Sequence, residues 1–408
     1  MSKPAIALVV PDLSVYSGVP AVALYLYRII TEAGRHQPEL ISIATSSNDR
    51  NSRRLFSPGT WGGPRSSEEE IRGHFYRHVG ASLTELEFQR YRPRRVLTEE
   101  LRRFDLVQIV AGTPPWTLVA KDFDGPIALQ VATLTAVERE SILRDTPWPR
   151  RAVMLLMTKI NTAMEPAALR LADAVFVEND WMYRRLLAEY GPEKVIFAAP
   201  GVDVEFFQPG EYQAQGPILS VGRFHDPRKN VSLLLRAYAQ LRQVRPDAPK
   251  LIMAGEVGPT ETDLALAAEL GILPHLEIQL AVSLDQLREL YRSASMFVLS
   301  SNEEGLGIVI LEAMACGIPV VSTRCGGPET SVVEGETGFL TPLNNAAAMS
   351  QRMNELLSDA SLGRRMGVNG RTRAVARFSL EATGRIYLEK YDELLSGRER
   401  PGPAGDRS

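Results

Sequence analysis

Cysteine is scarce in this sequence. The 408 residues include two, Cys316 and Cys325, in a segment whose apolar neighbours predict burial. No spacing typical of a metal site surrounds them. Such sparing use of cysteine favours a reducing compartment, so we expect a cytoplasmic protein.

An excess of charge of one sign is also lacking. The formal net charge is −3, which gives no electrostatic reason to expect a nucleic acid or an anionic membrane as a partner. No stretch of about 18 apolar residues is present, so no membrane-spanning helix is predicted. The apolar run before Pro11 is too short for a signal peptide, and we expect none.

What the sequence has instead is a regular alternation of short apolar runs with helical stretches. Hydrophobic content of 44% and charged content of 23% are ordinary for a soluble protein, and the length predicts two or three domains. Strands are predicted at 5–10, 38–45, 104–112, 126–134 and 172–180, and again at 217–224, 249–256, 296–301 and 318–324. Helices are predicted at 21–34, 150–172, 230–244, 284–294 and 307–317. This α/β order predicts two doubly wound parallel sheets with a cleft between them.

Three segments have features that the alternation alone does not explain. Residues 46–103 alternate weakly and form either a hairpin or an excursion from the sheet. The helix at 150–172 is rich in Met and Leu after two arginines; we favour packing in the interdomain region, with contact to a membrane surface as the alternative. The last residues, 397–408, are expected to be a flexible tail.

The stretch SNEEGLGIVILEAMACG, which begins at Ser301, carries the first candidate site. It follows a predicted strand, so its loop lies where open α/β sheets bind ligands. Gly305 and Gly307 allow close approach of the backbone, and the amides that begin the next helix can face an anion. Glu304 then suits the hydroxyl groups of a hexose, and Glu312 those of a ribose. For two glutamates in isolation, the commoner interpretation is a helix N-terminal charge and a solvated side chain.

A second motif, VGRFHDPRKN, makes the ligand interpretation stronger. It follows the first predicted strand of the second half and places Arg223 and Lys229 six residues apart around a turn that contains proline. Two cations at the carboxyl end of a strand can hold a diphosphate. A solvated basic loop is the alternative, but it would have to coincide with the glutamate motif.

Taken with GGPETSVVEGETGFL, APGVD and FSLEATGRIYLEKYDELL, these motifs resemble the retaining GT-B glycosyltransferases of family four, the glycosyl transferases group 1. The resemblance is close in the second half and loose in the first. It implies a GT-B fold with an N-terminal Rossmann-like domain at 1–206 and a nucleotide-sugar-binding domain at 207–379. The helix at about 380–396 is expected to pack back on the first domain.

The resemblance also implies an activity. The enzyme would move a hexosyl unit from a UDP- or GDP-sugar to a sugar, glycan, lipid or small-molecule acceptor, with retention of configuration. Attack on the same face of the sugar needs no side-chain nucleophile, no metal and no cofactor. Asp122-Phe123-Asp124 spells a metal–diphosphate signature of a different fold, but it precedes Gly-Pro and is expected to be a turn.

The family assigns roles to the positions that match its motifs. Arg223 and Lys229 would neutralise the departing diphosphate, and Glu304 would hold the transferred sugar. The residues expected to bind the donor are Gly18, Val19, Val282, Gly305, Leu306, Gly307, Ile308 and Glu312. Gly18 matches the first glycine of the family's N-terminal phosphate loop, whereas Val19 stands where the second glycine is usual.

The first half departs from the family at the acceptor side. The histidine that many members carry near the transferred sugar aligns with Leu134 or with a neighbour, Thr133 or Thr135, and Gln108 stands where another histidine is frequent. The segment from Gly73 to Arg95 offers aromatic and basic side chains, and we expect His74, Tyr76 and Arg77 in it to contact the acceptor. A surface hairpin is the alternative.

Other functions remain open at this stage. The missing histidine leaves a catalytically weak relative that binds nucleotide or glycan as a partner subunit. The retained Arg223, Lys229, Glu304 and Glu312 oppose that alternative. A GT-B epimerase or phosphorylase fits the glutamate motif poorly. The sequence also leaves open a peripheral contact at the inner face of the membrane.

Overall fold

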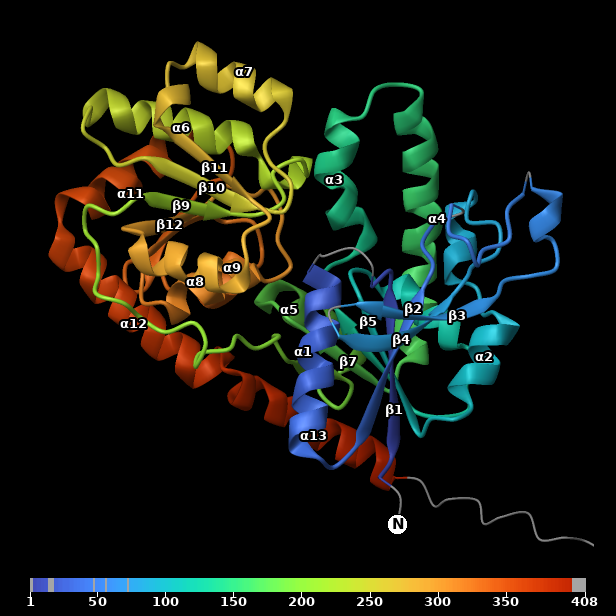
Figure 1. The fold of residues 1–408 in the computed structure, drawn as a ribbon. Helices are drawn as coiled ribbons and strands as arrows, with labels where there is room; N and C mark the ends of the chain where they lie inside the picture. The colour runs from blue at the N-terminus through green and yellow to red at the C-terminus, as the bar shows by residue number, and fades with distance from the viewer. Residues whose placement is uncertain (1–2, 14–17, 47, 56, 72, 398–408) are drawn as a thin grey trace, which may run out of the picture.

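Two β-sheets of mainly parallel strands, each flanked by helices, form the protein (Figure 1). The computed structural model describes residues 3–13, 18–46, 48–55, 57–71 and 73–397. Of the tail expected at 397–408, residues 398–408 lie outside the described residues.

The first sheet contains eight strands among the described residues, in the order β3-β4-β2-β1-β5-β6-β7-β8. All pairs are parallel except β3 with β4, which form an antiparallel hairpin at one edge. The strands are β1 (Ala5–Pro11), β2 (Gln37–Ile43), β3 (Ser66–Ile71), β4 (His74–Val79), β5 (Leu106–Ala111), β6 (Ile127–Val131), β7 (Ala174–Val177) and β8 (Val195–Phe197). The segment at 46–103 therefore includes a hairpin that extends the sheet, one of the two alternatives that the sequence left open.

Helices connect these strands. They are α1 (Gly18–Ala33), α2 (Arg95–Leu101), α3 (Thr135–Asp145), α4 (Arg150–Leu171) and α5 (Asp180–Tyr190), with short 3-10 helices η1 (Pro58–Thr60), η2 (Glu87–Tyr91) and η3 (Pro114–Ala120). The helices α3 and α4 form a hairpin that rises from the sheet (Figure 1).

The second sheet has the order β11-β10-β9-β12-β13-β14, and its pairs are parallel. Its strands are β9 (Ile218–Val221), β10 (Leu251–Gly255), β11 (Leu276–Leu280), β12 (Met296–Leu299), β13 (Val320–Thr323) and β14 (Gly338–Thr341). Its helices are η4 (Pro227–Lys229), α6 (Val231–Val244), α7 (Glu261–Glu269), η5 (Leu273–His275), α8 (Leu284–Ser293), α9 (Ile308–Ala315), α10 (Pro328–Ser331) and α11 (Ala346–Ser358). The two doubly wound sheets predicted from the alternation are thus confirmed.

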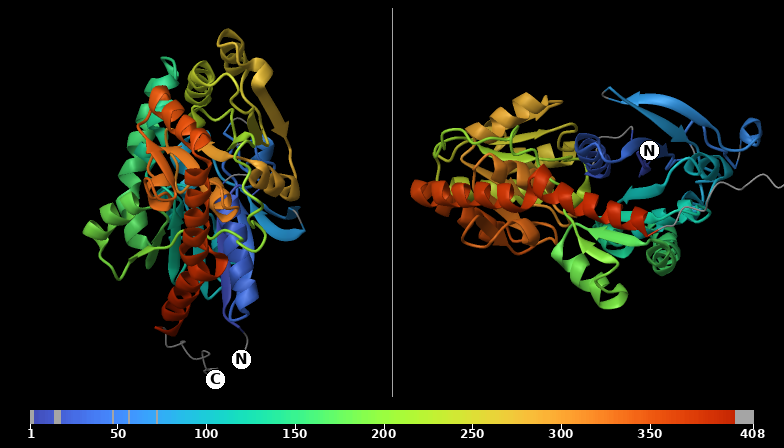
Figure 2. Two further views of the ribbon diagram at one scale, coloured as in Figure 1. Left: turned by 90° about the vertical axis from the view of Figure 1, so that its left-hand side faces the viewer. Right: turned by 90° about the horizontal axis from the view of Figure 1, so that it is seen from below.

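Two C-terminal helices, α12 (Ala360–Phe378) and α13 (Leu380–Ser396), run one after the other across both halves (Figure 2). α12 packs on α9 of the second half, and α13 packs on α1 of the first. Tyr387 and Tyr391 of α13 are fully buried with the first sheet's core. The boundaries that we expect for the two domains, 1–206 and 207–379, stay predictions.

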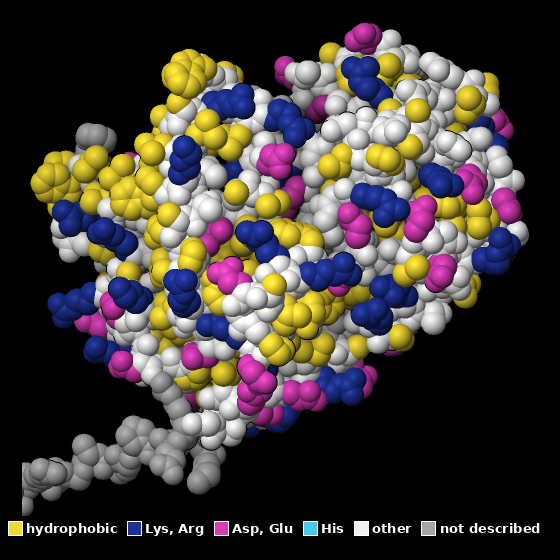
Figure 3. Space-filling view, turned by 180° about the vertical axis from the view of Figure 1, so that it is seen from behind, with side chains coloured by type: hydrophobic (Ala, Val, Ile, Leu, Met, Phe, Trp, Pro, Cys, Tyr) yellow, Lys and Arg dark blue, Asp and Glu magenta, His cyan; other side chains and the backbone are white. Residues whose placement is uncertain are grey.

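The helix α4 does not lie where we expected it. It packs against η2, η3 and α3 of the first half, whereas α3 meets η4 of the second half. The buried residues of α4 all lie from Thr158 onward, so its first two turns project from the body. Figure 3 shows hydrophobic side chains over the end of this hairpin and along α4, with Lys and Arg beside them. The interdomain position assigned to α4 was therefore wrong, because α3 occupies it.

Among the described residues, no helix combines the length and apolar character needed to cross a bilayer. Both cysteines are free and buried, as their apolar neighbours predicted.

The crossing of α12 over α9 generates a stability prediction. A methyl group on Gly367 would overlap the backbone carbonyl of Gly317, whereas one on Gly370 would lie 3.5 Å from the Met314 side chain in ordinary contact. We expect Gly367→Ala to destabilise the protein by about 1–3 kcal/mol through overpacking. The matched variant Gly370→Ala should be neutral or gain up to about 1 kcal/mol from helix propensity. Calorimetric melting of both variants checks this, and equal stability would show that the crossing can relax.

Candidate functional site

A cavity of about 940 Å³ lies between the two halves. It is bounded by the carboxyl ends of strands from both sheets, including the loops after β9 and β12, which are neighbours where the strand order of the second sheet reverses. Open α/β sheets bind ligands at this kind of position because the loops diverge there and leave a crevice.

Most of the residues singled out from the sequence line this cavity. The chain brings together Arg223, Lys229 and Glu304 with Gly18, Val19, Val282, Gly305, Leu306, Gly307, Ile308, Glu312 and Thr133. They come from segments as far apart in sequence as α1 and α9. A shared wall is consistent with one ligand contacting all of them, although their individual roles stay predictions.

Two glycines shape the loop before α9 for different reasons. Gly307 has a φ of +79°, a left-handed conformation that disfavours other residues. Gly305 lies so close to the first half that a methyl group on it would overlap the carboxyl group of Glu178. The glycine motif thus serves one backbone turn and one close approach between the halves.

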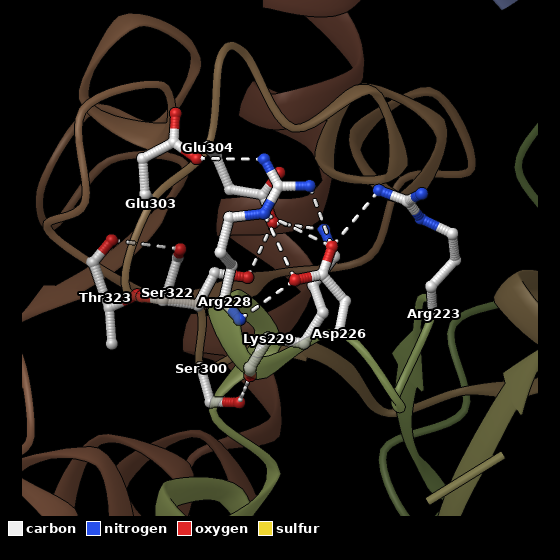
Figure 4. A network of polar contacts seen from close by, with 10 residues as sticks. Arg223, Asp226, Arg228, Lys229, Ser300, Glu303, Glu304, Ser322 and Thr323 are labelled. Atoms are coloured by element: carbon white, nitrogen blue, oxygen red, sulfur yellow. Dashed lines mark hydrogen bonds and ion pairs between the residues drawn. The ribbon is translucent and has the colours of Figure 1, made fainter. Parts of the chain in front are cut away.

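An ionic network centred on Asp226 organises the loop after β9 (Figure 4). Arg228 Nη2 lies 2.8 Å from Asp226 Oδ2, and Arg223 Nη2 lies 3.2 Å from the same oxygen. Burial would raise the pKa of Asp226, but the hydrogen bonds and charge of Arg228 bring it down to about 2. Asp226 therefore stays ionised and holds both guanidinium groups in place.

Arg228 also connects this loop to its surroundings. Its Nη1 lies 3.4 Å from Glu303 Oε2 and 3.9 Å from Glu138 Oε1 of α3 in the first half. Its backbone carbonyl accepts a 2.7 Å hydrogen bond from the amide of Asn302. Arg228 was not among the predicted site residues, although it stands inside the VGRFHDPRKN motif.

Lys229 and Glu304, which the sequence assigned to different parts of a donor, contact each other. Lys229 Nζ donates to Glu304 Oε1 at 2.6 Å, and Ser301 Oγ donates to the same oxygen at 2.6 Å. Both charged side chains are mostly buried, at 17% and 12% exposure. The cation and the carboxylate therefore form an ion pair in the wall of the cavity.

Four carboxyl groups of the cavity have raised pKa values, and burial is the largest cause in each, including Glu138 of α3. Burial raises the pKa of Glu303 to about 7, against the lowering effect of Arg228. Burial likewise raises the pKa of Glu312 to about 7, although the hydroxyl of Tyr291 donates to Glu312 Oε2 at 2.8 Å. The pKa of Glu178 rises to about 8, chiefly through burial. Glu312 lines the cavity and bonds to Tyr291, so its interpretation as a solvated side chain gains no support.

Asn179 fastens the glycine loop to the first half. Its side-chain amide donates to the carbonyls of Ala132 and Gly305 at 2.9 and 2.7 Å, while its Oδ1 caps α5 by accepting from the Met182 amide. Asn179 is fully buried. One side chain thus connects the carboxyl ends of β6 and β7 to the loop that precedes α9.

The acceptor candidates are dispersed. Thr133 lines the cavity, and its buried hydroxyl has no hydrogen-bond partner among the described residues. Leu134 points into the core of the first sheet, and the amide of Thr135 begins α3 with a 2.7 Å bond to Glu165. Of the three residues aligned with the missing histidine, Thr133 lines the cavity, whereas Leu134 and Thr135 do not.

The residues His74, Tyr76 and Arg77 are not among those that line the cavity. Tyr76 donates to Glu69 at 3.0 Å, Arg77 pairs with Glu68 and Glu100, and the ring of His74 packs against Tyr27. Their strand, β4, lies beyond β2 from the centre of the sheet. The expected acceptor contact of this segment gains no structural support.

Metal-binding side chains are not grouped in the part of the chain that the structure describes: no three His, Cys, Asp or Glu residues are clustered there. Asp122 lies in the turn before β6 and does not line the cavity.

Comparison with known proteins agrees with this geometry. Residues 201–373 match the family of glycosyl transferases group 1. D-inositol 3-phosphate glycosyltransferase of Streptomyces avermitilis is 32% identical over 324 residues, which cover 73% of this chain and 67% of the relative. The GDP-mannose-dependent alpha-(1-6)-phosphatidylinositol monomannoside mannosyltransferase of Mycolicibacterium smegmatis is 31% identical over 246 residues, covering 56% of this chain and 63% of the relative.

A solved structure shows the same fold at low sequence identity. Anabaena Alr3699/HepE in complex with UDP and glucose superposes with a TM-score of 0.69 at 15% identity, covering 96% of this chain and 100% of the other. The two doubly wound sheets and the cleft between them are those of the GT-B fold. The chain belongs to the glycosyl transferases group 1 and is a glycosyltransferase, as its motifs indicated.

The hydrogen bonds of Asn179 predict that a substitution of nearly the same shape lowers the stability of the protein. Asn179→Asp keeps an oxygen that can cap α5 but replaces the amide donor by an acceptor that faces two carbonyl oxygens. We expect a loss of about 1–3 kcal/mol, the usual penalty for unsatisfied buried polar groups, seen as a lower melting temperature at neutral pH. The control Asp180→Asn changes an exposed neighbour and should alter the melting temperature little. An unaffected Asn179→Asp protein would mean that the halves are not joined by this bond.

Proposed function

We propose that this glycosyltransferase transfers a hexosyl unit from a UDP- or GDP-sugar to an acceptor hydroxyl, with retention of configuration and without a metal ion. The observation that carries the proposal is the meeting of two cations, Arg223 and Lys229, with the Glu304–Gly307 loop in one cavity. Cations at the strand ends suit a diphosphate, and buried carboxylates with backbone amides suit sugar hydroxyls.

Either nucleotide is compatible with what is known of similar proteins. The mycobacterial relative is described as GDP-mannose-dependent, and the Anabaena structure holds UDP and glucose. Val282, just before the capping residue Ser283 of α8, lines the cavity and is proposed to meet the base through its backbone. Backbone contacts of this kind discriminate weakly between uracil and guanine, so we leave both nucleotides in the proposal.

In the proposed reaction, different residues contact different parts of the donor. The bond from the sugar's anomeric carbon to the phosphate oxygen breaks, and the acceptor oxygen bonds to the same face of that carbon. The acceptor's proton passes to the departing phosphate oxygen. Arg223, one-third exposed, and Lys229 stabilise the charge that develops on the diphosphate. Glu304 holds the transferred sugar, and Glu312 accepts from the ribose.

The acceptor is proposed to enter beside α3. Thr133 precedes this helix and offers a hydroxyl without a partner among the described residues. From there α3 leads to the projecting end of the α3–α4 hairpin (Figure 1). An acceptor held at a surface near that end would reach the cavity along the helix.

The hairpin end has the composition of a membrane contact, and we propose that it touches an anionic lipid surface at the inner face of the membrane. Trp148, Val153 and Leu156 are 77%, 63% and 55% exposed. Arg150 and Arg151 are exposed beside them, and no ion pair of either is found among the described residues. Apolar side chains flanked by free cations favour the boundary of an anionic bilayer. A lipid-linked acceptor follows from this arrangement.

Charge neutralisation gives the first functional prediction. Arg223→Ala and Lys229→Ala should each lower turnover by about 10²- to 10³-fold, as loss of a group that stabilises transition-state charge usually does. The control Arg236→Ala removes an exposed cation on α6 and should leave turnover unchanged. The assay measures release of nucleoside diphosphate from a panel of UDP- and GDP-sugars, with binding followed by calorimetry.

The same assay tests the finer parts of the proposal. Release should persist in EDTA, and proton NMR should show a product with the donor's anomeric configuration. Turnover that stops in EDTA and returns with manganese would overturn metal independence. Tight nucleotide binding without release or transfer would favour the partner-subunit alternative.

Membrane contact predicts a separate result. Replacing Trp148, Val153 and Leu156 together by Ser, or Arg150 and Arg151 by Ala, should weaken binding to phosphatidylcholine–phosphatidylglycerol vesicles by roughly tenfold or more. The matched triple variant Val244→Ser, Val368→Ser and Val375→Ser changes exposed valines elsewhere and should bind normally. Sedimentation with vesicles measures both. Equal binding by all variants, or none by the native protein, would refute the contact.

A further inference from the structure

A buried acid that the proposed reaction does not use faces the cavity from the first half. Glu178 follows β7 directly, is 6% exposed and lines the cavity. Its carboxyl oxygen occupies the space that a side chain on Gly305 would need. The acid therefore lies against the loop that is proposed to hold the transferred sugar.

No cation compensates this acid. Among the described residues, Glu178 makes no ion pair, because Lys229 is paired with Glu304, and Arg228 with Asp226 and Glu303. The charged groups that face Glu178 from the opposite loop are the carboxyl groups of Glu303 and Glu304. A negative charge at this position would be both desolvated and repelled.

The polar neighbours of Glu178 leave its own proton free. Gln130 Nε2 donates to Glu178 Oε2 at 3.3 Å. The hydroxyl of Tyr387 lies 2.7 Å from both Gln130 Oε1 and the carbonyl of Ala198, and its single proton serves one of them. Burial first, and then Glu303 and Glu304, raise the pKa of Glu178 to about 8 against the hydrogen bond from Gln130. With Gln130 as its donor, the neutral acid has an O–H group that takes part in no hydrogen bond given for the described residues.

We propose that Glu178 is a neutral carboxylic acid that donates its O–H to a hydroxyl group of the transferred sugar, and so selects and orients that sugar. The proposal rests on the proposed function, because it needs the sugar to lie at the Glu304–Gly305 loop. Gly305 is the matched partner of this acid: only a residue without a side chain lets the loop approach it.

The first experiment tests the neutral state without any substrate. Glu178→Gln replaces the acid by an amide of the same shape that does not titrate. Between pH 4.5 and about 8, a native acid that stays protonated only when folded favours the unfolded state progressively as pH rises. The melting temperature of native protein should therefore fall relative to that of Glu178→Gln across this range and run parallel to it above pH 8.

Glu303 and Glu312 titrate in both proteins, so their contribution largely cancels in this difference. The control Glu269→Gln removes an exposed carboxyl group on α7 and should show no such trend. If the melting temperatures of native and Glu178→Gln proteins change in parallel from pH 5 to 9, Glu178 is ionised in the folded protein and the proposal fails.

The second experiment tests the contact with the sugar. Glu178→Ala should lower kcat/KM for the sugar donor by roughly tenfold to a hundredfold, since the sugar hydroxyl loses its donor, while affinity for free nucleoside diphosphate stays the same. Glu178→Gln keeps an N–H donor and should lose less than tenfold. Native kcat/KM should decline above about pH 8 as Glu178 ionises, and this decline should vanish in Glu178→Gln.

The outcomes separate the two proposals. Unchanged kcat/KM in Glu178→Ala, or the same high-pH decline in Glu178→Gln, overturns the role of Glu178 while nucleotide binding still supports the proposed function. Absence of nucleoside diphosphate binding in the native protein overturns the proposed function, and with it the sugar contact.

Discussion

The arrangement of the site depends on the position of one buried cation, Arg228. Its guanidinium group contacts Asp226 of its own loop, Glu303 of the loop after β12 and, at 3.9 Å, Glu138 of the first half. Burial would lower the pKa of Arg228, but Asp226 raises it, so the charge is retained. Because three segments converge on this charge, removing it would leave several buried carboxyl groups without compensation. The network therefore holds the loops after β9 and β12 close together.

A cleft so rich in carboxyl groups accepts an anionic donor only if most of those groups are paired or neutral. Asp226 and Glu304 are paired with cations, and burial raises the pKa values of Glu178, Glu303 and Glu312 toward or above neutrality. A diphosphate entering near Arg223 would raise these pKa values further, since it adds negative charge. The same side chains that would repel an anion when ionised become hydroxyl-binding groups when neutral. Binding of a sugar diphosphate and protonation of the cleft thus favour each other.

The second half of the site was predictable because its determinants are local in sequence. Each motif follows a strand, so the sequence places Arg223, Lys229 and the Glu304 loop at the same edge of one parallel sheet. Their meeting also requires β9 and β12 to be neighbours, which the sheet order of the structure supplies. Glu178 and Asn179 were not predictable in this way. They stand in FVEND, which reads as an ordinary strand end, and their importance arises from contact with Gly305 across the cleft.

The acceptor contacts were not predictable from the sequence for a related reason. His74, Tyr76 and Arg77 have side chains suited to sugars, but their strand pairs beyond β2, away from the point where the first sheet's order reverses. The amino-acid composition of this segment does not indicate where its strand lies in the sheet. Thr133, which the alignment with a missing histidine brought forward, lies at the end of β6 nearer the reversal and does line the cavity. Side-chain chemistry indicates what a residue can bind, whereas strand order decides whether the residue meets the ligand. In the first half, the strand order depends on a hairpin that the sequence left ambiguous.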